Sequence, residues 1–149
     1  MKKRSLRFYH THTEECLETT YKKGGAYVPK GLKQIDYIMR DYRTGQIYPM
    51  DPKLLDFLYD LLTAVNNHGE VHIICGYRSL ETNKKLHQQD SKGVSKRSLH
   101  MHGRALDFRL SGTDTKRLRD VALALKRGGV GYYTKSDFIQ IDTGRVRFW

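Results

Sequence analysis

Cysteine is scarce in this sequence of 149 residues, which contains only Cys16 and Cys75. Two cysteines do not make a disulfide framework, and we therefore expect both side chains to be free thiols. Long apolar runs are also missing, and no stretch approaches the roughly 20 apolar residues of a membrane-spanning helix. The basic start MKKRSLRFYH is not followed by an apolar segment, so we expect no signal peptide within these residues.

Acidic residues are few relative to basic ones: 16 Asp and Glu stand against 27 Lys and Arg, for a net charge of +11. The excess is concentrated in residues 91–149, which hold 13 basic and 5 acidic side chains. Such a surface favours an anionic partner, either nucleic acid or an acidic polymer such as cell wall. No helix-turn-helix signature, paired finger spacing or aromatic RNA-binding motif is present, and we therefore expect no nucleic-acid partner.

The pattern of apolar residues predicts an α+β fold, with helices flanking a mainly antiparallel sheet, in one domain over residues 1–149. No repeat or low-complexity stretch divides the chain. Alternation and turn residues predict strands over residues 5–13, 16–28 (a hairpin), 71–75, 103–110, 130–133, 137–141 and 145–149. Apolar side chains at helical spacing predict helices over residues 29–42, 51–69, 79–89 and 113–128.

Two residues of types that bind metals, His100 and Asp107, stand close together in the segment SLHMHGRALDF. Gly103 between them permits a tight turn, by which His100 can fold back toward the strand that carries Asp107. Asp107 lies within an apolar strand, and a buried carboxylate needs a partner. That partner is a metal ion in one interpretation. In the other, Asp107 pairs with an arginine or backbone amides, and His100 is an ordinary surface histidine.

A hydrolytic zinc site usually has three protein ligands and one open position, so a third ligand is needed. In DFIQIDTG, Gln140 and Asp142 are two residues apart in a predicted strand and therefore point to the same side. In GYRS, Arg78 directly follows the strand VHIIC, and an arginine at a strand end can hold a carboxylate or a developing oxyanion. A structural ion pair is the alternative role for Arg78.

Three segments, GYRSLETN, SLHMHGRALD and GGVGYYTKSDFIQIDTGRVRFW, together resemble the zinc-dependent peptidoglycan peptidases of the D-Ala-D-Ala peptidase superfamily. That superfamily also contains the lysostaphin-type enzymes and the hedgehog domain, and the chain resembles its YcbK-like murein endopeptidases. The likeness extends through FYHTHTEE and MRDYRTGQIYPMDPKLLDFL, so it covers nearly the whole chain. It implies a hedgehog-like fold, a zinc cofactor, peptidoglycan peptides as substrate, and a periplasmic or other extracytoplasmic location in bacteria. We expect a monomer.

The resemblance also implies roles for individual residues. His100 and Asp107 match the first two zinc ligands of the family. Ser98 belongs to the same motif and is assigned to substrate binding. Tyr77 and Arg78 match the Tyr-Arg of the GYRS motif, in which the arginine would hold the substrate carbonyl or a carboxylate.

The final motif of the family reads His-x-Asp-x-Gly, and its histidine is the third ligand. Here Gln140 stands in that position, while Asp142 and Gly144 are retained. For Asp142 the resemblance leaves three roles: general base, a partner outside the ligand set, or a ligand. Cys75 stands where the family often has serine, and we assign it no role.

A glutamine amide is a poorer zinc ligand than imidazole, so we expect weak zinc binding and impaired hydrolysis. Three explanations of Gln140 stay open at this stage. The glutamine is an engineered change that inactivates the enzyme, or a natural change that leaves a non-catalytic peptidoglycan-binding domain on the same fold. In the third, another side chain, such as His102 or Asp142, completes the site.

Overall fold

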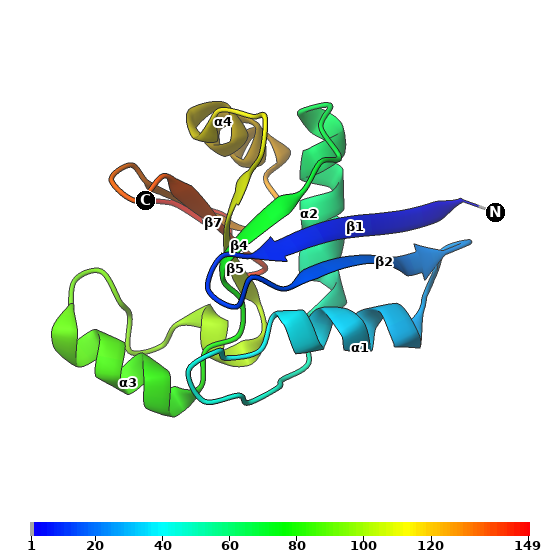
Figure 1. Ribbon diagram of the computed structural model, residues 1–149. Coiled ribbons are helices and arrows are strands. Elements are labelled where there is room, and N and C mark those ends of the chain that lie inside the picture. The colour runs from blue at the N-terminus through cyan, green and yellow to red at the C-terminus, as the bar shows by residue number, and fades with distance from the viewer. Residues whose placement is uncertain (1) are drawn as a thin grey trace.

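The computed structural model describes residues 2–149 and shows an α+β fold built on one sheet of eight strands (Figure 1). In chain order the strands are β1 (Lys3–His10), β2 (Cys16–Lys23), β3 (Ala26–Tyr27), β4 (Val71–Cys75), β5 (Ala105–Leu110), β6 (Gly129–Tyr133), β7 (Phe138–Asp142) and β8 (Arg147–Phe148). The helices are α1 (Pro29–Ile38), α2 (Pro52–Ala64), α3 (Leu80–Gln89), the short 3-10 helix η1 (Leu99–His102) and α4 (Thr115–Leu125). Within residues 2–149, no helix has the length and apolar character needed to cross a membrane.

The sheet is mixed rather than purely antiparallel. Its strands run in the order β3-β2-β1-β4-β5-β7-β6-β8. Five of the seven neighbouring pairs are antiparallel, as predicted. Strand β1 pairs with β4, and β6 with β8, in parallel. Helices α1 and α2 lie between β1 and β4 in the chain, and a connection of this length allows β4 to run parallel to β1.

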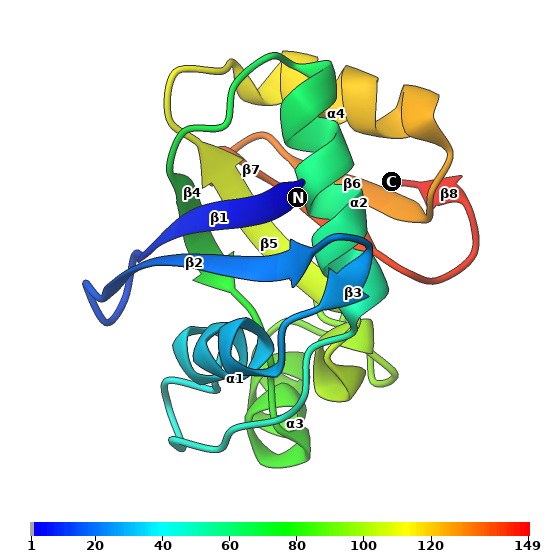
Figure 2. The ribbon, with the colours of Figure 1, turned by 90° about the vertical axis from the view of Figure 1, so that its right-hand side faces the viewer.

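The two faces of the central strands have different roles. Alternate residues of a strand point to opposite faces. One face packs against α2 and α4, and Figure 2 shows α2 lying across the strands. The core on this face includes the buried side chains of Leu6, Phe8, Leu54, Leu58, Leu61, Val71, Ile73, Leu106, Phe108, Ile139 and Ile141. The opposite face of β4, β5 and β7 is left for polar side chains.

The helix predicted over residues 29–42 ends earlier, at Ile38. The chain turns away because the carboxylate of Asp41 accepts three backbone hydrogen bonds, from the N–H groups of Arg43 at 2.9 Å, Thr44 at 3.4 Å and Ser79 at 3.0 Å. The bond from Ser79 ties this turn to the segment that follows β4. Asp41 therefore ends the helical region and supports the GYRS segment at once.

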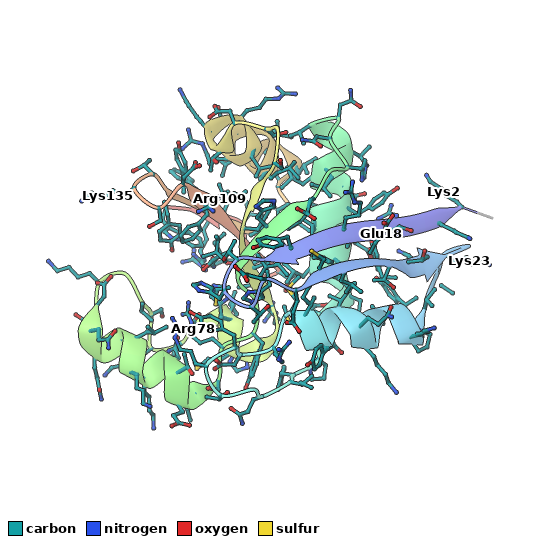
Figure 3. All side chains as sticks on the ribbon, in the orientation of Figure 1. Lys2, Glu18, Lys23, Arg78, Arg109 and Lys135 are labelled. Carbon is teal, nitrogen blue, oxygen red and sulfur yellow. The ribbon has the colours of Figure 1, made fainter. Side chains whose placement is uncertain are left out.

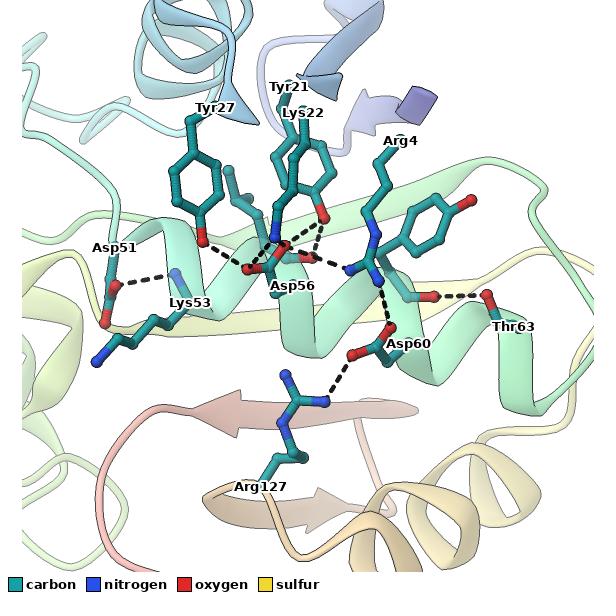
Figure 4. A network of polar contacts seen from close by, with 12 residues as sticks. Arg4, Tyr21, Lys22, Tyr27, Asp51, Lys53, Asp56, Asp60, Thr63 and Arg127 are labelled. Atoms are coloured by element: carbon teal, nitrogen blue, oxygen red, sulfur yellow. Dashed lines mark hydrogen bonds and ion pairs between the residues drawn. The ribbon is translucent and has the colours of Figure 1, made fainter. Parts of the chain in front are cut away.

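Two carboxylates on α2 fasten this helix to its neighbours (Figure 4). Asp56 accepts a hydrogen bond of 2.8 Å from the hydroxyl of Tyr21, a completely buried side chain. Asp60 lies 3.3 Å from Arg4 on β1 and 2.6 Å from Arg127, which follows α4. These contacts fix α2 relative to both halves of the sheet.

His10 is a buried histidine at the end of β1, with 1% of its surface exposed. Its Nδ1 accepts hydrogen bonds from the backbone N–H groups of His12 at 3.1 Å and Thr13 at 3.4 Å. Burial, together with the nearby His12, lowers the pKa of His10 to about 4. The folded protein therefore holds this imidazole neutral, whereas the unfolded chain protonates it near pH 6.5.

We expect the free energy of unfolding to fall by about 2 kcal/mol between pH 7 and pH 5 through His10 alone. The sign follows because the unfolded state binds more protons in this range, so stability decreases as the pH decreases. His10→Asn keeps an acceptor for the two backbone N–H groups but does not titrate. Between pH 7 and pH 5 its free energy of unfolding should therefore fall by about 2 kcal/mol less than that of the unaltered protein. Urea unfolding of both proteins at the two pH values measures the difference. An equal pH dependence in both would refute the prediction.

Candidate active site

Cys75, Asp107 and Gln140 form a row across three neighbouring strands. Cys75 pairs with Asp107 between β4 and β5, and Asp107 pairs with Gln140 between β5 and β7. Directly paired residues of adjacent strands project side by side on the same face. Asp107 and Gln140 are buried, with 6% and 9% of their surface exposed. The row thus places polar side chains together on the face of the sheet opposite α2.

An irregularity in β4 brings Cys75 into this row. Ile73 pairs with Phe108, and uninterrupted pairing would place Ile74 opposite Asp107. The register shifts between Ile73 and Cys75, so that Cys75 takes that position instead. Bulges of this kind re-aim a side chain and are frequent next to active sites.

Helix η1 carries His100 over the row. The helix starts after Ser98, whose hydroxyl accepts a hydrogen bond from the backbone N–H of His100 at 3.2 Å. It ends at Gly103, which has the left-handed φ of 64° that favours glycine. The chain then enters β5, and His100 lies back over that strand with its Nε2 3.2 Å from Asp107 Oδ1. The turn predicted from the glycine is confirmed.

Hydrogen bonding decides which ring nitrogen of His100 faces the row. The carbonyl oxygen of Gly76 lies 2.8 Å from Nδ1, and since a carbonyl only accepts, Nδ1 carries the donated proton. Nε2 therefore faces Asp107 Oδ1 and Gln140 Oε1, each 3.2 Å away. Metal-binding histidines usually have this arrangement, with one ring nitrogen donating to a carbonyl and the other directed at the metal.

The donor atoms around Asp107 fit a metal ion. Only 9% of the Asp107 side chain is exposed, and its Oδ1 contacts His100 Nε2 at 3.2 Å as an ion pair, without a well-aligned hydrogen bond in residues 2–149. Ligand atoms of Cys75, His100 and Asp107 all lie within 4.8 Å of one another. Burial works against a charged imidazole, but the carboxylate of Asp107 and the Cys75 thiol outweigh it and hold the pKa of His100 well above its usual value. One sulfur, one imidazole nitrogen and one carboxylate oxygen are the atom types that bind zinc.

The amide of Gln140 is oriented by Asp142, as the strand alternation predicted for two residues on one side. Gln140 Nε2 donates to Asp142 Oδ2 at 3.2 Å, and a carboxylate only accepts. The amide oxygen, Oε1, is therefore the atom directed at His100. Gln140 presents a neutral oxygen to the cluster.

Asp142 is completely buried and has its acceptor positions filled. Its Oδ1 accepts from the backbone N–H groups of Gly129 at 2.9 Å and Gly144 at 3.0 Å. Its Oδ2 accepts from Gln140 and from Arg147, the latter at 3.1 Å. Of the three roles left open by the sequence, these contacts favour a residue that orients Gln140 over one that takes a proton from water.

Arg78 lies between α3 and the sheet, beside the cluster (Figure 3). One of its terminal nitrogens donates to Asn83 Oδ1 at 3.0 Å, and the other lies 3.6 Å from Cys75 Sγ. Its Nε is buried and has no hydrogen-bond partner in the described part of the chain. Among residues 2–149 no carboxylate forms an ion pair with Arg78, so its charge is available to a ligand.

The other two residues assigned to substrate lie differently. Ser98 lines the groove described below, and its hydroxyl oxygen caps η1. Tyr77 stacks on Tyr48 with ring centroids 4.9 Å apart, and it is not among the residues that line the groove.

A groove of about 480 Å³ opens at His100, Asp107 and Gln140. It lies between the loop that follows α3 and the C-terminal strands, and Figure 1 shows these two regions facing each other. Most of its remaining side chains are basic or aromatic: Arg78, Lys92, Arg97, Arg145, Arg147, Tyr133, Phe138 and Trp149. A larger hollow of about 800 Å³ lies between β2 and α1 and contains none of the cluster residues. Part of the excess of basic residues in the C-terminal part of the chain therefore lies around the candidate metal ligands.

Sequence reasoning missed Cys75. Its only signal was its position at the end of a buried strand, directly before GYRS. His102, considered as a replacement ligand, is exposed, and it does not belong to the cluster of Cys75, His100 and Asp107.

An imidazole and a carboxylate that share a buried donor site beside a basic groove are typical of metal-dependent hydrolases. The family model described as peptidoglycan L,D-endopeptidase MepK matches residues 1–149. The chain therefore belongs to the MepK family, within the D-Ala-D-Ala peptidase superfamily that its motifs predicted.

Named relatives agree with this family. The probable peptidoglycan L,D-endopeptidase MepK of Haemophilus influenzae is 42% identical over 149 residues, which cover 99% of this chain and 80% of that protein. The peptidoglycan L,D-endopeptidase MepK of Escherichia coli K12 is 39% identical over 146 residues, covering 98% of this chain and 80% of that protein. No solved structure matches the chain.

Proposed function

We propose that residues 1–149 act as one hedgehog-like peptidase domain, a zinc-dependent peptidoglycan peptidase in which His100 and Asp107 are metal ligands. The observation that carries this proposal is the buried cluster in which Asp107 Oδ1 lies 3.2 Å from His100 Nε2 and the ligand atoms of Cys75, His100 and Asp107 lie within 4.8 Å of one another. The activity is impaired because Gln140 replaces the imidazole expected as third ligand. Peptidoglycan peptides are the partner, the protein acts outside the cytoplasm as a monomer, and nucleic acid is not a substrate.

Zinc in such a site polarises the scissile carbonyl and lowers the pKa of a water molecule. The chain itself supplies the geometry around it. The Gly76 carbonyl holds His100 Nδ1, which leaves Nε2 directed at the metal position. Asp107 supplies negative charge from the middle of the sheet, where burial keeps competing water away.

Gln140 weakens this arrangement in two ways. Its amide oxygen carries no full charge and is much less basic than imidazole. Asp142 holds the amide nitrogen, so the oxygen remains beside the cluster but as a weak donor. We infer that Asp142, which would support a histidine at this position equally well, is a positioning residue rather than the proton acceptor.

Arg78 is the residue that binds the substrate carbonyl or a neighbouring carboxylate. Peptidoglycan stem peptides carry free carboxylates, and the groove offers several cations and aromatic faces beside the cluster. An arginine with no carboxylate partner binds such groups strongly through paired N–H donors. Ser98 contributes by fixing η1 and by lining the same groove.

Arg78→Ala is expected to weaken binding of soluble muropeptides about 10- to 100-fold, the loss typical for hydrogen bonds to a charged group. Lys135→Ala removes one positive charge at the tip of the β6–β7 hairpin, outside the groove lining, and serves as the control (Figure 3). Isothermal titration with purified muropeptides measures both. Unchanged binding in Arg78→Ala would show that the arginine has no role in substrate recognition.

A non-catalytic peptidoglycan-binding domain is the second candidate, and Gln140 is the observation that favours it. The two functions separate in an assay of purified, crosslinked peptidoglycan with zinc-loaded protein. The peptidase releases soluble muropeptides slowly and stops when zinc is chelated. Binding to the insoluble wall with no release, even when the protein holds zinc, would instead establish the binding domain.

A further inference from the structure

We infer that Cys75 is a zinc ligand of this chain and supplies the third donor that Gln140 does not. The inference rests on the proposed function, because it assumes that zinc binds at His100 and Asp107. It changes the composition of the site from two imidazoles and a carboxylate to one thiolate, one imidazole and one carboxylate.

The geometry of the sheet makes Cys75 and Gln140 alternative positions for the third protein ligand. Both residues pair directly with Asp107, Cys75 from β4 and Gln140 from β7. They therefore stand on opposite flanks of the same carboxylate, with His100 above. A metal held by His100 and Asp107 can take its third protein ligand from either flank.

The bulge in β4 is what makes the thiol available. With regular pairing, the apolar side chain of Ile74 would stand opposite Asp107. The extra residue instead brings the Cys75 sulfur to within 4.8 Å of the ligand atoms of His100 and Asp107. The bulge thus places a thiol beside a buried carboxylate whose Oδ1 has no well-aligned hydrogen bond in the described chain. A metal ion that binds both groups would account for this arrangement.

Arg78 is a cation next to the sulfur: one of its terminal nitrogens donates toward Sγ at 3.6 Å, while the thiol lies 3.8 Å from the Gly76 carbonyl, to which it can donate. On zinc binding the thiol releases its proton to solvent and the thiolate binds the metal. Thiolate and carboxylate together balance the two positive charges of zinc. Because a thiolate donates more charge than an imidazole, zinc in such a site would polarise a carbonyl less, in agreement with the slow hydrolysis proposed above.

Cobalt(II) is the probe, because a sulfur ligand gives it a strong charge-transfer absorption in the near ultraviolet that oxygen and nitrogen ligands do not. We expect this band in the unaltered protein and in Cys16→Ser, the control, since Cys16 is exposed on β2, with β1 between it and β4, and is not in the cluster. Cys75→Ser should lose the band and bind zinc at least about tenfold more weakly in competition with a chelator. In a Gln140→His background the loss should be smaller, because the site then has three ligands without Cys75.

Alkylation supplies a readout that needs no Cys75 variant. Bound zinc should slow iodoacetamide modification of Cys75 at least about tenfold, while Cys16 in the same molecule reacts equally with and without zinc. Cobalt binding without a sulfur band, together with no protection of Cys75, would overturn the inference and leave the His100–Asp107 site standing. Failure of both the unaltered chain and Gln140→His to bind cobalt or zinc would overturn the proposed function itself.

Discussion

Gln140→His is expected to raise the release of soluble muropeptides from purified peptidoglycan at least about tenfold. Losing a residue that only supports a metal ligand typically costs about 10- to 100-fold in activity, so restoring a ligand should gain at least the lower of these factors. The physical reason is the exchange of a neutral amide oxygen for an imidazole nitrogen at a position that already faces His100 Nε2 at 3.2 Å. Zinc content after dialysis should rise in the same variant. Both proteins are measured side by side at equal zinc concentration.

Gln46→His is the matched control for this substitution. Gln46 is exposed in the loop after α1, so the variant adds the same imidazole away from the cluster. It should leave zinc content and hydrolysis unchanged. Equal, zinc-dependent activity in the unaltered chain and in Gln140→His would show that Gln140 is no defect.

His100→Ala, introduced into the Gln140→His protein, is expected to reduce zinc affinity and hydrolysis at least about 100-fold. Loss of a ligand should exceed the 10- to 100-fold cost of losing a group that only supports one. His102→Ala is the control, because His102 lies in the same short helix but is exposed and outside the cluster. Chelator competition and muropeptide release measure the two effects. Zinc affinity that survives in His100→Ala, or falls equally in His102→Ala, would refute the assignment.

Local sequence patterns were sufficient to predict several parts of the site. Gly103 predicted the turn that returns His100 to β5, because few other residues adopt its backbone conformation easily. Strand alternation predicted that Gln140 and Asp142 lie on one side, and their side chains are hydrogen bonded. The helix predicted from residue 51 does begin there: Asp51 is the N-cap of α2, and its carboxylate accepts the N–H of Lys53.

Features that depend on pairing between distant segments were not predictable in this way. The parallel pairing of β1 with β4 joins residues about 60 positions apart, and no local pattern encodes it. The bulge that brings Cys75 opposite Asp107 exists only relative to the register of β5. Tyr77 was assigned to substrate by its motif, yet its ring stacks on Tyr48 from a loop more than 25 residues earlier. Motifs thus indicated the chemistry, whereas the sheet determined which side chains meet.

Mass spectrometry of crosslinked muropeptides tests the central claim most directly. The zinc-loaded protein, the same protein after chelation, and the chelated protein with zinc restored are incubated with a purified crosslinked substrate. A zinc peptidase should convert the dimer into monomers whose summed mass exceeds that of the dimer by one water, slowly in the unaltered chain and faster in Gln140→His. Conversion should stop on chelation and return with zinc. An intact dimer in the presence of both zinc-loaded proteins, or cleavage that is insensitive to chelation, would contradict the account.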